Sequence, residues 1–217
     1  MGGLLLTLEG IEGSGKSTQA FQLQLQLEAQ KVPVILTREP GGTPLAERIR
    51  DVVLGLGQEP VEARAELLLF LAARAQHVAR TILPALTQGR VVVCDRFTDA
   101  TLAYQGGGRT IPDEFLRSLN DWATSGIRPD RTYLIDVPVE VGFARARSRA
   151  REGRPDRMES EGIGFFEAVR ARYLEIAAQE PERVLVLRGT DSIESISHQI
   201  VSDVSRLLSA RAHNLQR

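Results

Sequence analysis

Short runs of apolar residues, rich in valine, isoleucine and leucine, alternate along the chain with longer segments of helix-forming composition. The apolar runs cover residues 4–8, 32–37, 91–95, 132–137 and 184–187. Each run has the length of a strand, and each segment between two runs is long enough for a helix. This alternation predicts an α/β fold with three α/β/α layers, in which helices cover both faces of a five-stranded parallel sheet.

The third run contains Val-Val-Val-Cys without polar alternation, which is typical of a central strand buried on both faces. Cys94 is then expected to be a small buried hydrophobe. It is the only cysteine of the chain, so it cannot form an internal disulfide bond.

Three of the intervening segments favour helices on different grounds. Residues 63–87 contain no glycine and no proline before Pro84, and they predict one long helix. Residues 22–27 alternate glutamine and leucine, which imitates a strand, but both are good helix formers and a helix is predicted. Residues 193–208 carry apolar side chains at a period near 3.6, which predicts a helix with one face on the sheet.

The composition indicates an ordinary globular protein. The 217 residues carry a net charge of −1, and 42% are hydrophobic. The length fits one domain over residues 1–217. The near-neutral charge gives no global attraction to nucleic acid or anionic membranes, so neither partner is expected. No apolar run is long enough for a spanning helix or a signal sequence, and the expected compartment is the cytoplasm.

A phosphate-binding loop follows the first predicted strand. Residues 10–17 read GIEGSGKS and fit the pattern GxxxxGK followed by Ser or Thr. Such loops turn backbone N–H groups toward an anion, and the N-terminus of the next helix adds its positive dipole end. Gly10, Ile11, Glu12, Gly13, Ser14, Gly15, Lys16 and Ser17 are therefore the predicted ATP-binding residues. Lys16 would reach the β- and γ-phosphates, and Ser17 would offer its hydroxyl to Mg²⁺.

Arginine provides 25 of the 27 basic residues, and the only lysines are Lys16 and Lys31. The lysine at position 16 therefore stands out from the composition. A compact ammonium group fits among converging N–H groups, where a planar guanidinium would not.

The loop alone leaves several nucleotide-using classes open. A GTPase is disfavoured because guanine recognition in that class usually uses an Asn-Lys-x-Asp segment. The two asparagines of this chain are Asn120 and Asn214, and neither is followed by lysine. A compact kinase fits the length best. A kinase of another nucleoside monophosphate or of a deoxynucleoside stays open, as does an ATP-dependent switch or DNA-stimulated ATPase.

Further candidate residues lie near the expected carboxyl edge of the sheet, where open α/β folds bind ligands. Asp95 and Arg96 end the third run; Asp95 is placed to hold Mg²⁺ through water and Arg96 to bind a phosphate. Phe70 and Arg74 share a helix face and could stack on and bond to a base. Glu12 places a carboxylate inside a phosphate loop, which predicts a hydroxyl or a metal as its partner.

These motifs together resemble bacterial thymidylate kinases, members of the phosphate-loop nucleoside monophosphate kinases. The resemblance rests on residues 9–18 (EGIEGSGKST), 37–43 (TREPGGT), 95–97 (DRF) and 103–109 (AYQGGGR), in the same order along nearly the whole chain. It implies transfer of the γ-phosphoryl group of ATP to dTMP, giving dTDP and ADP for dTTP synthesis, with Mg²⁺. It also implies a homodimer.

The resemblance carries over to single residues of the acceptor site. Phe70 would stack on thymine and Arg74 would bond its carbonyl edge. Thr101 would approach the base, Tyr104 would crowd the 2′ position, and Gln105 would belong to the same substrate site.

The acceptor phosphate and the transfer step are assigned in the same way. Arg96 and Arg38 would lie near the acceptor phosphate, and Glu12 near the 3′-hydroxyl. Lys16, Glu12 and Arg96 are the expected catalytic residues here. Ala100 departs from the family pattern, which usually has serine there, so Ala100 is left out of the predicted site.

An arginine-rich segment completes the predicted machinery. Six arginines fall between Arg145 and Arg157, but they point to opposite faces of a helix, and no aromatic residue lies among them for base stacking. The phosphate loop has no arginine at its variable positions. A mobile lid at about 145–161 is therefore expected to supply the catalytic arginine, Arg149 first, with Arg154 and Arg145 as alternatives.

Overall fold

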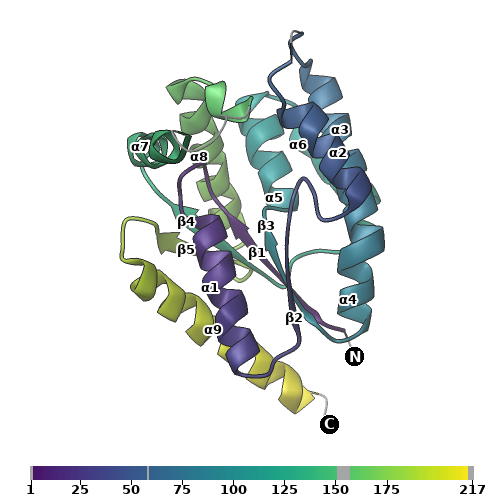
Figure 1. Ribbon diagram of the computed structural model, residues 1–217, viewed down its shortest axis with the longest axis vertical. Coiled ribbons are helices and arrows are strands. Elements are labelled where there is room, and N and C mark those ends of the chain that lie inside the picture. The colour runs from purple at the N-terminus through teal and green to yellow at the C-terminus, as the bar shows by residue number, and fades with distance from the viewer. Residues whose placement is uncertain (1, 58, 151–156, 215–217) are drawn as a thin grey trace.

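The computed structural model describes residues 2–57, 59–150 and 157–214 of this chain, and it confirms the predicted α/β fold. Five strands form one parallel sheet in the order β2-β3-β1-β4-β5. Figure 1 shows this sheet between two layers of helices. The strands are β1 (Leu4–Glu9), β2 (Val34–Arg38), β3 (Val91–Asp95), β4 (Arg131–Asp136) and β5 (Val184–Arg188).

Helices link the strands and cover both faces of the sheet. Their bounds are α1 (Lys16–Ala29), α2 (Pro44–Leu54), α3 (Ala63–His77), α4 (Leu83–Thr87), α5 (Thr98–Thr101), α6 (Asp113–Thr124), α7 (Val139–Ala150), α8 (Ile163–Gln179) and α9 (Ile193–Asn214). A short 3₁₀ helix spans Met158–Ser160. None of the helices in the described part of the chain is long and apolar enough to cross a membrane.

Each face of the sheet has its own apolar core. On one face, Leu23 of α1 and Ile200 of α9 pack with Leu6 and Val93 of the two central strands. This confirms the predicted helix over the Gln-Leu repeat and the predicted packing of the last helix, which ends six residues later than expected. On the other face, α3, α6 and α8 pack around a larger cluster that includes Phe166. Cys94 is fully buried, as predicted, and burial raises the pKa of its thiol.

Strand register brings the chemistry-bearing residues to one edge. Leu8 of β1 and Arg38 of β2 both pair with Asp95 of β3. Because parallel strands end together, the phosphate loop after β1, the loop after β2 and the turn after β3 start at the same edge. β2 begins two residues later than predicted, since the N–H of Val32 donates to Leu27 O at the end of α1.

The segment predicted as one long α-helix is continuous but changes its hydrogen-bond pattern. Between α3 and α4 lies a π-helical stretch, Val78–Ile82, which immediately precedes α4 and its Pro84. Proline has no N–H to donate to the carbonyl four residues earlier, so the regular α pattern fails there. The prediction was right about the helix and wrong about its uniformity.

The glycines of the AYQGGGR motif lie inside a π-helical segment, Leu102–Gly108, that continues α5. A Cβ at Gly107 would lie 2.9 Å from Ala168 O, and one at Gly108 would lie 2.3 Å from the ring of Phe165. These glycines therefore allow α8 to approach the segment closely, and this contact fixes Tyr104 and Gln105 beside the site.

Candidate active site

The phosphate loop follows β1, and its lysine is the first residue of α1. Lys16 Nζ donates to Ile11 O at 2.8 Å and to Ser14 Oγ at 3.3 Å, so the side chain folds across the loop. Burial lowers the pKa of Lys16 to about 8. Its ammonium group is therefore mostly charged at neutral pH and held where a polyphosphate would enter the loop.

The phosphate loop also rests on the start of α7. A Cβ at Gly13 would lie 2.1 Å from Gly142 O, and a Cβ at Gly142 would lie 2.6 Å from Glu12 O. Only glycine at both positions allows this approach. The contact places the helix that carries Arg145 and Arg147 directly beside the phosphate loop.

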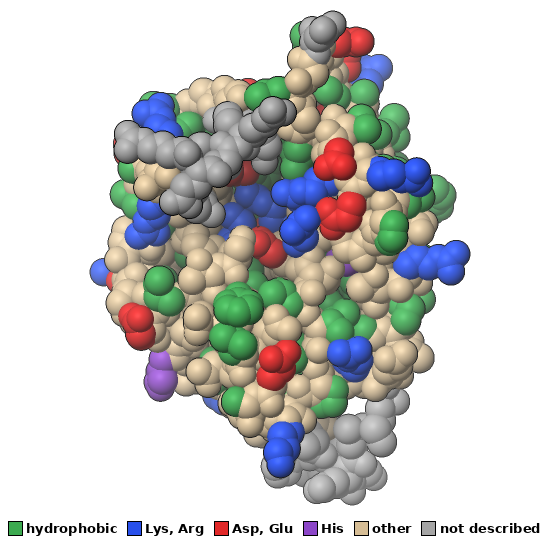
Figure 2. All heavy atoms as spheres, in the orientation of Figure 1, with side chains coloured by type: hydrophobic (Ala, Val, Ile, Leu, Met, Phe, Trp, Pro, Cys, Tyr) green, Lys and Arg blue, Asp and Glu red, His purple; other side chains and the backbone are tan. Residues whose placement is uncertain are grey.

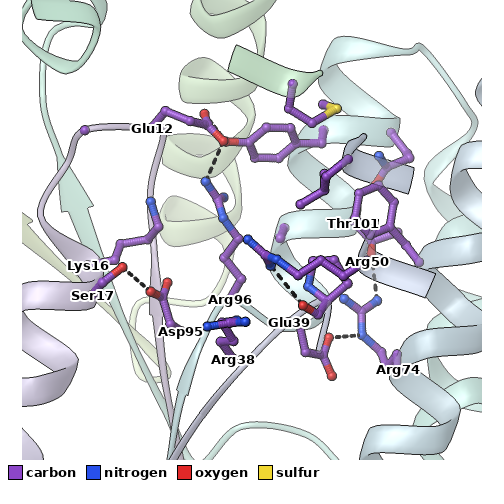
Figure 3. A pocket seen from close by; sticks show the side chains of 18 residues that line it. Glu12, Lys16, Ser17, Arg38, Glu39, Arg50, Arg74, Asp95, Arg96 and Thr101 are labelled. Carbon is purple, nitrogen blue, oxygen red and sulfur yellow. Dashed lines mark hydrogen bonds and ion pairs between the residues drawn. The ribbon is translucent and has the colours of Figure 1, made fainter. Parts of the chain in front are cut away.

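The predicted metal ligands meet at the end of β3. Ser17 Oγ donates to Asp95 Oδ2 at 2.5 Å, as Figure 3 shows. Mg²⁺ takes oxygen ligands, usually one or two from the protein with the rest from water and phosphates. A hydroxyl and a carboxylate beside the phosphate loop fit this ion. Among the described residues, no group of three or more His, Cys, Asp or Glu side chains offers a fuller protein cage.

Arg96 adopts a left-handed backbone conformation, with φ of 72°, in the turn after β3. Its N–H donates to Leu8 O, and the next N–H, of Phe97, donates to Glu9 Oε1 at 2.7 Å. The end of β1 therefore fixes a turn that is unfavourable for a non-glycine residue. This places the Arg96 side chain over the phosphate loop.

The Arg96 guanidinium is held on several sides. Nη2 donates to Glu12 Oε1 at 2.8 Å, and Nη1 donates to Gly10 O at 3.1 Å. The group also lies 4.8 Å from the centre of the Tyr104 ring, and the Tyr104 hydroxyl donates to Glu12 Oε2 at 2.6 Å. Glu12 thus has the separate partner that its place in a phosphate loop requires, and Figure 3 shows it facing Arg96.

Glu9 was part of a quoted motif but had no predicted role, and it is fully buried beneath Arg96. It accepts from the N–H of Phe97 and from the hydroxyl of Tyr173, both at 2.7 Å. Burial, aided by the nearby charge of Asp99, raises the pKa of Glu9 to about 7. Its place at the end of β1, one residue before the loop, is the only sequence signal that pointed to it.

The TREPGGT loop after β2 and the helix that follows it each contribute an arginine. Arg38 is half-exposed and pairs with Glu47 at 2.9 Å. Arg50 of α2 donates to Pro40 O at 2.9 Å and lines the same cavity. Sequence reasoning missed Arg50; its spacing from Arg38 and its place on an amphipathic helix gave no reason to choose it over Arg48.

Arg74 lies deeper than a surface base-binding group would. Only 3% of its side chain is exposed, and Nε donates to Glu39 Oε2 at 2.7 Å. Its other nitrogens donate to Thr101 Oγ1 at 2.7 Å, to Asn120 Oδ1 at 2.6 Å and to Phe97 O at 2.8 Å. The arginine that the sequence assigned to the base therefore also ties three segments of the fold together.

His77, the last residue of α3, packs against the TREPGGT loop. It is fully buried, and its ring nitrogens contact Glu39 Oε1 at 3.0 Å and Thr37 Oγ1 at 2.7 Å. A Cβ at Gly42 would lie 2.4 Å from the His77 ring. The TREPGGT loop therefore packs directly against the His77 ring.

One cavity of about 310 Å³ collects the predicted residues. Figure 2 shows basic side chains gathered in a hollow of the surface, and Figure 3 shows them converging from separate elements. Every predicted substrate-binding and metal-binding residue lines this cavity. The set comprises Ser17, Arg38, Phe70, Arg74, Asp95, Arg96, Thr101, Tyr104 and Gln105. Lys16, Glu12 and Ala100 line it too, as do Leu54 and Met158, which were not predicted.

The arginine-rich segment is described only in part. The side chain of Arg149 lies outside the described residues, and so do Arg151 and Arg154. Arg145 Nη1 donates to Gly189 O at 2.9 Å, which ties it to the loop after β5. Arg157 donates to Val53 O at 3.0 Å and to Glu66 Oε2 at 2.7 Å, so this last arginine of the segment is anchored away from the phosphate loop.

Comparison with known proteins gives a consistent result. The family model described as thymidylate kinase matches residues 8–200. A thymidylate kinase of Pseudomonas putida (strain GB-1) is 52% identical over 92% of this chain and 94% of its own length. One from Ectopseudomonas mendocina (strain ymp) is 52% identical over 97% of this chain and 99% of its own length.

A solved structure agrees with these relatives. The crystal structure of thymidylate kinase from Ehrlichia chaffeensis superposes with a TM-score of 0.75, at 32% identity, covering 94% of this chain and 99% of the other. The matching region runs from the end of β1 into α9 and contains the whole cavity described above. By sequence and by fold, this chain belongs to the thymidylate kinase family.

Proposed function

We propose that this chain transfers the γ-phosphoryl group of ATP to dTMP, giving dTDP and ADP in the synthesis of dTTP. The observation that carries the proposal is the single cavity in which a phosphate loop with its lysine meets an aromatic ring and several arginines. A phosphoryl-transfer enzyme needs its two substrates positioned in line and the migrating charge neutralised. The cavity supplies groups for both tasks.

The donor side of the reaction uses the phosphate loop. Lys16 binds the β- and γ-phosphates, and the backbone N–H groups of residues 10–17 surround them. Ser17 and Asp95 would hold Mg²⁺, which when bound neutralises phosphate charge during transfer. The acceptor phosphate oxygen attacks the γ-phosphorus and ADP leaves, so the residues need to position and stabilise charge rather than move a proton.

The acceptor side is proposed residue by residue. Phe70 stacks on thymine, Arg74 donates to its carbonyl edge, and Thr101 lies against the base. Tyr104 crowds the 2′ position of the sugar. Gln105 lines the wall of the cavity next to Thr101.

The acceptor phosphate meets Arg96 and Arg38, and Arg50 joins them from α2. Glu12 lies near the 3′-hydroxyl. Before the acceptor enters, the Arg96 guanidinium already has a fixed direction from Glu12 and Gly10, so little side-chain entropy is lost on binding.

The central experiment is a coupled assay of ADP release with candidate monophosphates. We expect turnover with dTMP, and loss of turnover with little loss of dTMP binding in Lys16→Ala. Phe70→Ala should raise the KM for dTMP, since the stacking surface is lost. Turnover on another nucleotide with none on dTMP would reject the proposal. ADP release that rises with added DNA, without a nucleoside diphosphate product, would favour a DNA-stimulated ATPase.

We further propose that residues 1–217 form one kinase domain in which the segment at about 145–161 acts as a lid and Arg149 supplies the catalytic arginine. The docking of α7 on the phosphate loop supports this, because it starts the segment directly beside that loop. Arg149→Ala should lower kcat by about 10³-fold or more. Arg147→Ala is the matched control, since the Arg147 guanidinium lies 5.7 Å over the Phe143 ring. Equal losses in both variants would contradict the assignment.

We propose that the protein forms a homodimer through the outer face of α3, α4 and α6. Large apolar side chains there are exposed: Leu68 by 62%, Leu83 by 46%, Phe115 by 54% and Trp122 by 81%. An exposed apolar face of this kind can meet the same face of a second copy across a two-fold axis.

The oligomeric state tests this directly. Sedimentation should show a dimer that dissociates in Trp122→Glu. In the matched control, Phe21→Glu on α1, at 50% exposure, the dimer should persist. A wild-type monomer at micromolar concentration would refute the dimer. The cytoplasmic location and the lack of nucleic-acid or membrane partners stay predictions.

A further inference from the structure

Glu66, in the first turn of α3, is a fully buried carboxylate that the reaction described above does not use. It accepts from Gln105 Nε2 at 2.8 Å and from Arg157 Nη2 at 2.7 Å. Arg109 donates to it from Nη2 at 3.1 Å and from Nε at 3.4 Å. One carboxylate therefore joins α3, the π-helical segment after α5 and the end of the arginine-rich segment.

The surroundings of Glu66 fix its charge state. Burial alone would raise its pKa, but the hydrogen bonds from Arg109, Gln105 and Arg157 outweigh burial and hold the pKa below its usual value. Glu66 is therefore ionised at neutral pH. An ionised carboxylate can only accept hydrogen bonds.

This dictates the orientation of the Gln105 amide. The NH₂ group must face Glu66, because the carbonyl oxygen would be repelled there. Gln105 also lines the cavity, and within the described part of the chain its Oε1 forms no hydrogen bond. The carbonyl oxygen is thus the amide atom left to meet a ligand, and it is a fixed acceptor.

A donor-only group lies next to this acceptor. Arg74 donates to Thr101, and Thr101 is one turn before Gln105 on the same helical stretch. Glu39, Thr101, Asn120 and Phe97 take four of the five guanidinium N–H groups of Arg74, which leaves one Nη2 N–H for a ligand in the cavity that Gln105 also lines. A pyrimidine with a ring carbonyl beside a ring N–H, as in thymine and uracil, complements this pair. Cytosine presents an amino group beside a bare nitrogen and opposes it at both atoms.

We propose that Glu66 is a positioning residue that determines base specificity, by holding the Gln105 amide so that its oxygen accepts from the N–H of a thymine-like ring. The inference rests on the proposed function, which places the base against Arg74 and Gln105. It adds a residue that never touches the substrate.

Glu66→Gln tests the inference, because an amide can donate as well as accept and so releases the Gln105 amide to turn over. Specificity is read as the ratio of kcat/KM for dTMP to that for dCMP. We expect this ratio to fall at least tenfold, mainly through a higher KM for dTMP and a lower KM for dCMP. The ratio of dTMP to dUMP should not change, since both bases carry the same edge. The KM for ATP should not change either.

Two controls separate orientation from structural support, and a third variant replaces Glu66→Gln if that variant does not fold. Glu66→Asp keeps an acceptor-only group and should keep the dTMP-to-dCMP ratio, whatever its total activity. Arg109→Lys disturbs the same cluster without altering the polarity of Glu66 and should also keep the ratio. If Glu66→Gln does not fold, Gln105→Met decides instead, since removing the acceptor should lower the ratio in the same way.

A ratio within twofold of wild type in folded Glu66→Gln, or in Gln105→Met, would overturn the inference. An equal fall in Glu66→Asp and Glu66→Gln would also overturn it, because both variants would then report only lost support. Equilibrium binding of dTMP, dUMP and dCMP gives the same ratios without turnover. A wild-type protein that binds these nucleotides but transfers no phosphoryl group would contradict the proposed function. The binding ratios would still test the role of Glu66 in base specificity.

Discussion

Removing the side chain of Arg74 should damage the stability of the protein as well as its binding of the base. In Arg74→Met, the Glu39 carboxylate stays buried and keeps only its contact with His77. The hydrogen bonds from Arg74 to Thr101 and Asn120 are also lost. The methionine keeps much of the volume, so the main loss is electrostatic. The perturbation therefore measures what a buried arginine contributes to this fold.

The expected magnitude follows from burial. Both Arg74 and Glu39 have side chains less than 5% exposed, so solvent screens their interaction little. Breaking a buried ion pair by removing one partner costs about 3–5 kcal/mol. For a domain of this size, 1 kcal/mol shifts Tm by about 2–4 °C, so Tm should fall by about 6–20 °C.

The pH dependence of the stability difference between wild type and Arg74→Met gives a second, independent test. In the wild type, Arg74 and His77 outweigh the effect of burial and hold the pKa of Glu39 below its usual value, so this stability is present at neutral pH and lost in acid. Without Arg74, burial raises the pKa of Glu39 instead. The penalty of the variant should then be greatest at pH 7 and shrink toward pH 5, as Glu39 takes up a proton.

Denaturant unfolding of wild type, Arg74→Met and the double variant Glu39→Gln/Arg74→Met would measure these differences. The double variant removes the unpaired charge and should recover part of the lost stability, about 1–3 kcal/mol. A single variant destabilised by less than 1 kcal/mol, or one whose penalty is the same at pH 5 and pH 7, would refute the assignment of Arg74 to the core.

Three further outcomes are expected. Because burial lowers the pKa of Lys16 to about 8, ATP binding should weaken above pH 8 by up to tenfold per pH unit, with proton uptake in calorimetry; affinity that is flat from pH 7 to 9 would contradict this. Gly142→Ala sets a methyl group 2.6 Å from Glu12 O and should raise the KM for ATP about tenfold while changing that for dTMP less. Tyr173→Phe deprives the Glu9 carboxylate of a donor, so it should destabilise the fold by about 1–3 kcal/mol, and more as pH rises through about 7, where Glu9 ionises; a penalty that shrinks over that range would count against it.

Much of the fold was readable from the sequence because its signals are local. Apolar runs of strand length fixed all five strands to within one or two residues at their ends. The phosphate loop is a contiguous motif, and Asp95-Arg96 marks the end of a strand. Parallel strands end at one edge, so the meeting of Ser17 with Asp95 also followed from the sequence pattern.

Helix and loop propensities did not predict two features of the backbone. The helix over residues 63–87 has uniform propensity, yet it contains a π-helical stretch just before Pro84. Consecutive glycines usually favour a loop, but Gly107 and Gly108 lie in a helical segment and allow the close approach of α8. The missing N–H of Pro84 explains the first case, and the packing of α8 against the glycines explains the second.

The sequence by itself determined the architecture, the phosphate loop and the kinds of side chain that line the cavity. Only the tertiary structure decided how those side chains are paired. Arg74 meets Glu39 across 35 positions of the chain, and Glu66 meets Arg157 across 91. The chain contains many arginines and carboxylates of equal local character. Which of them pair depends on which elements pack together, and the pairing then sets the charge, direction and hydrogen-bond polarity of each group in the site.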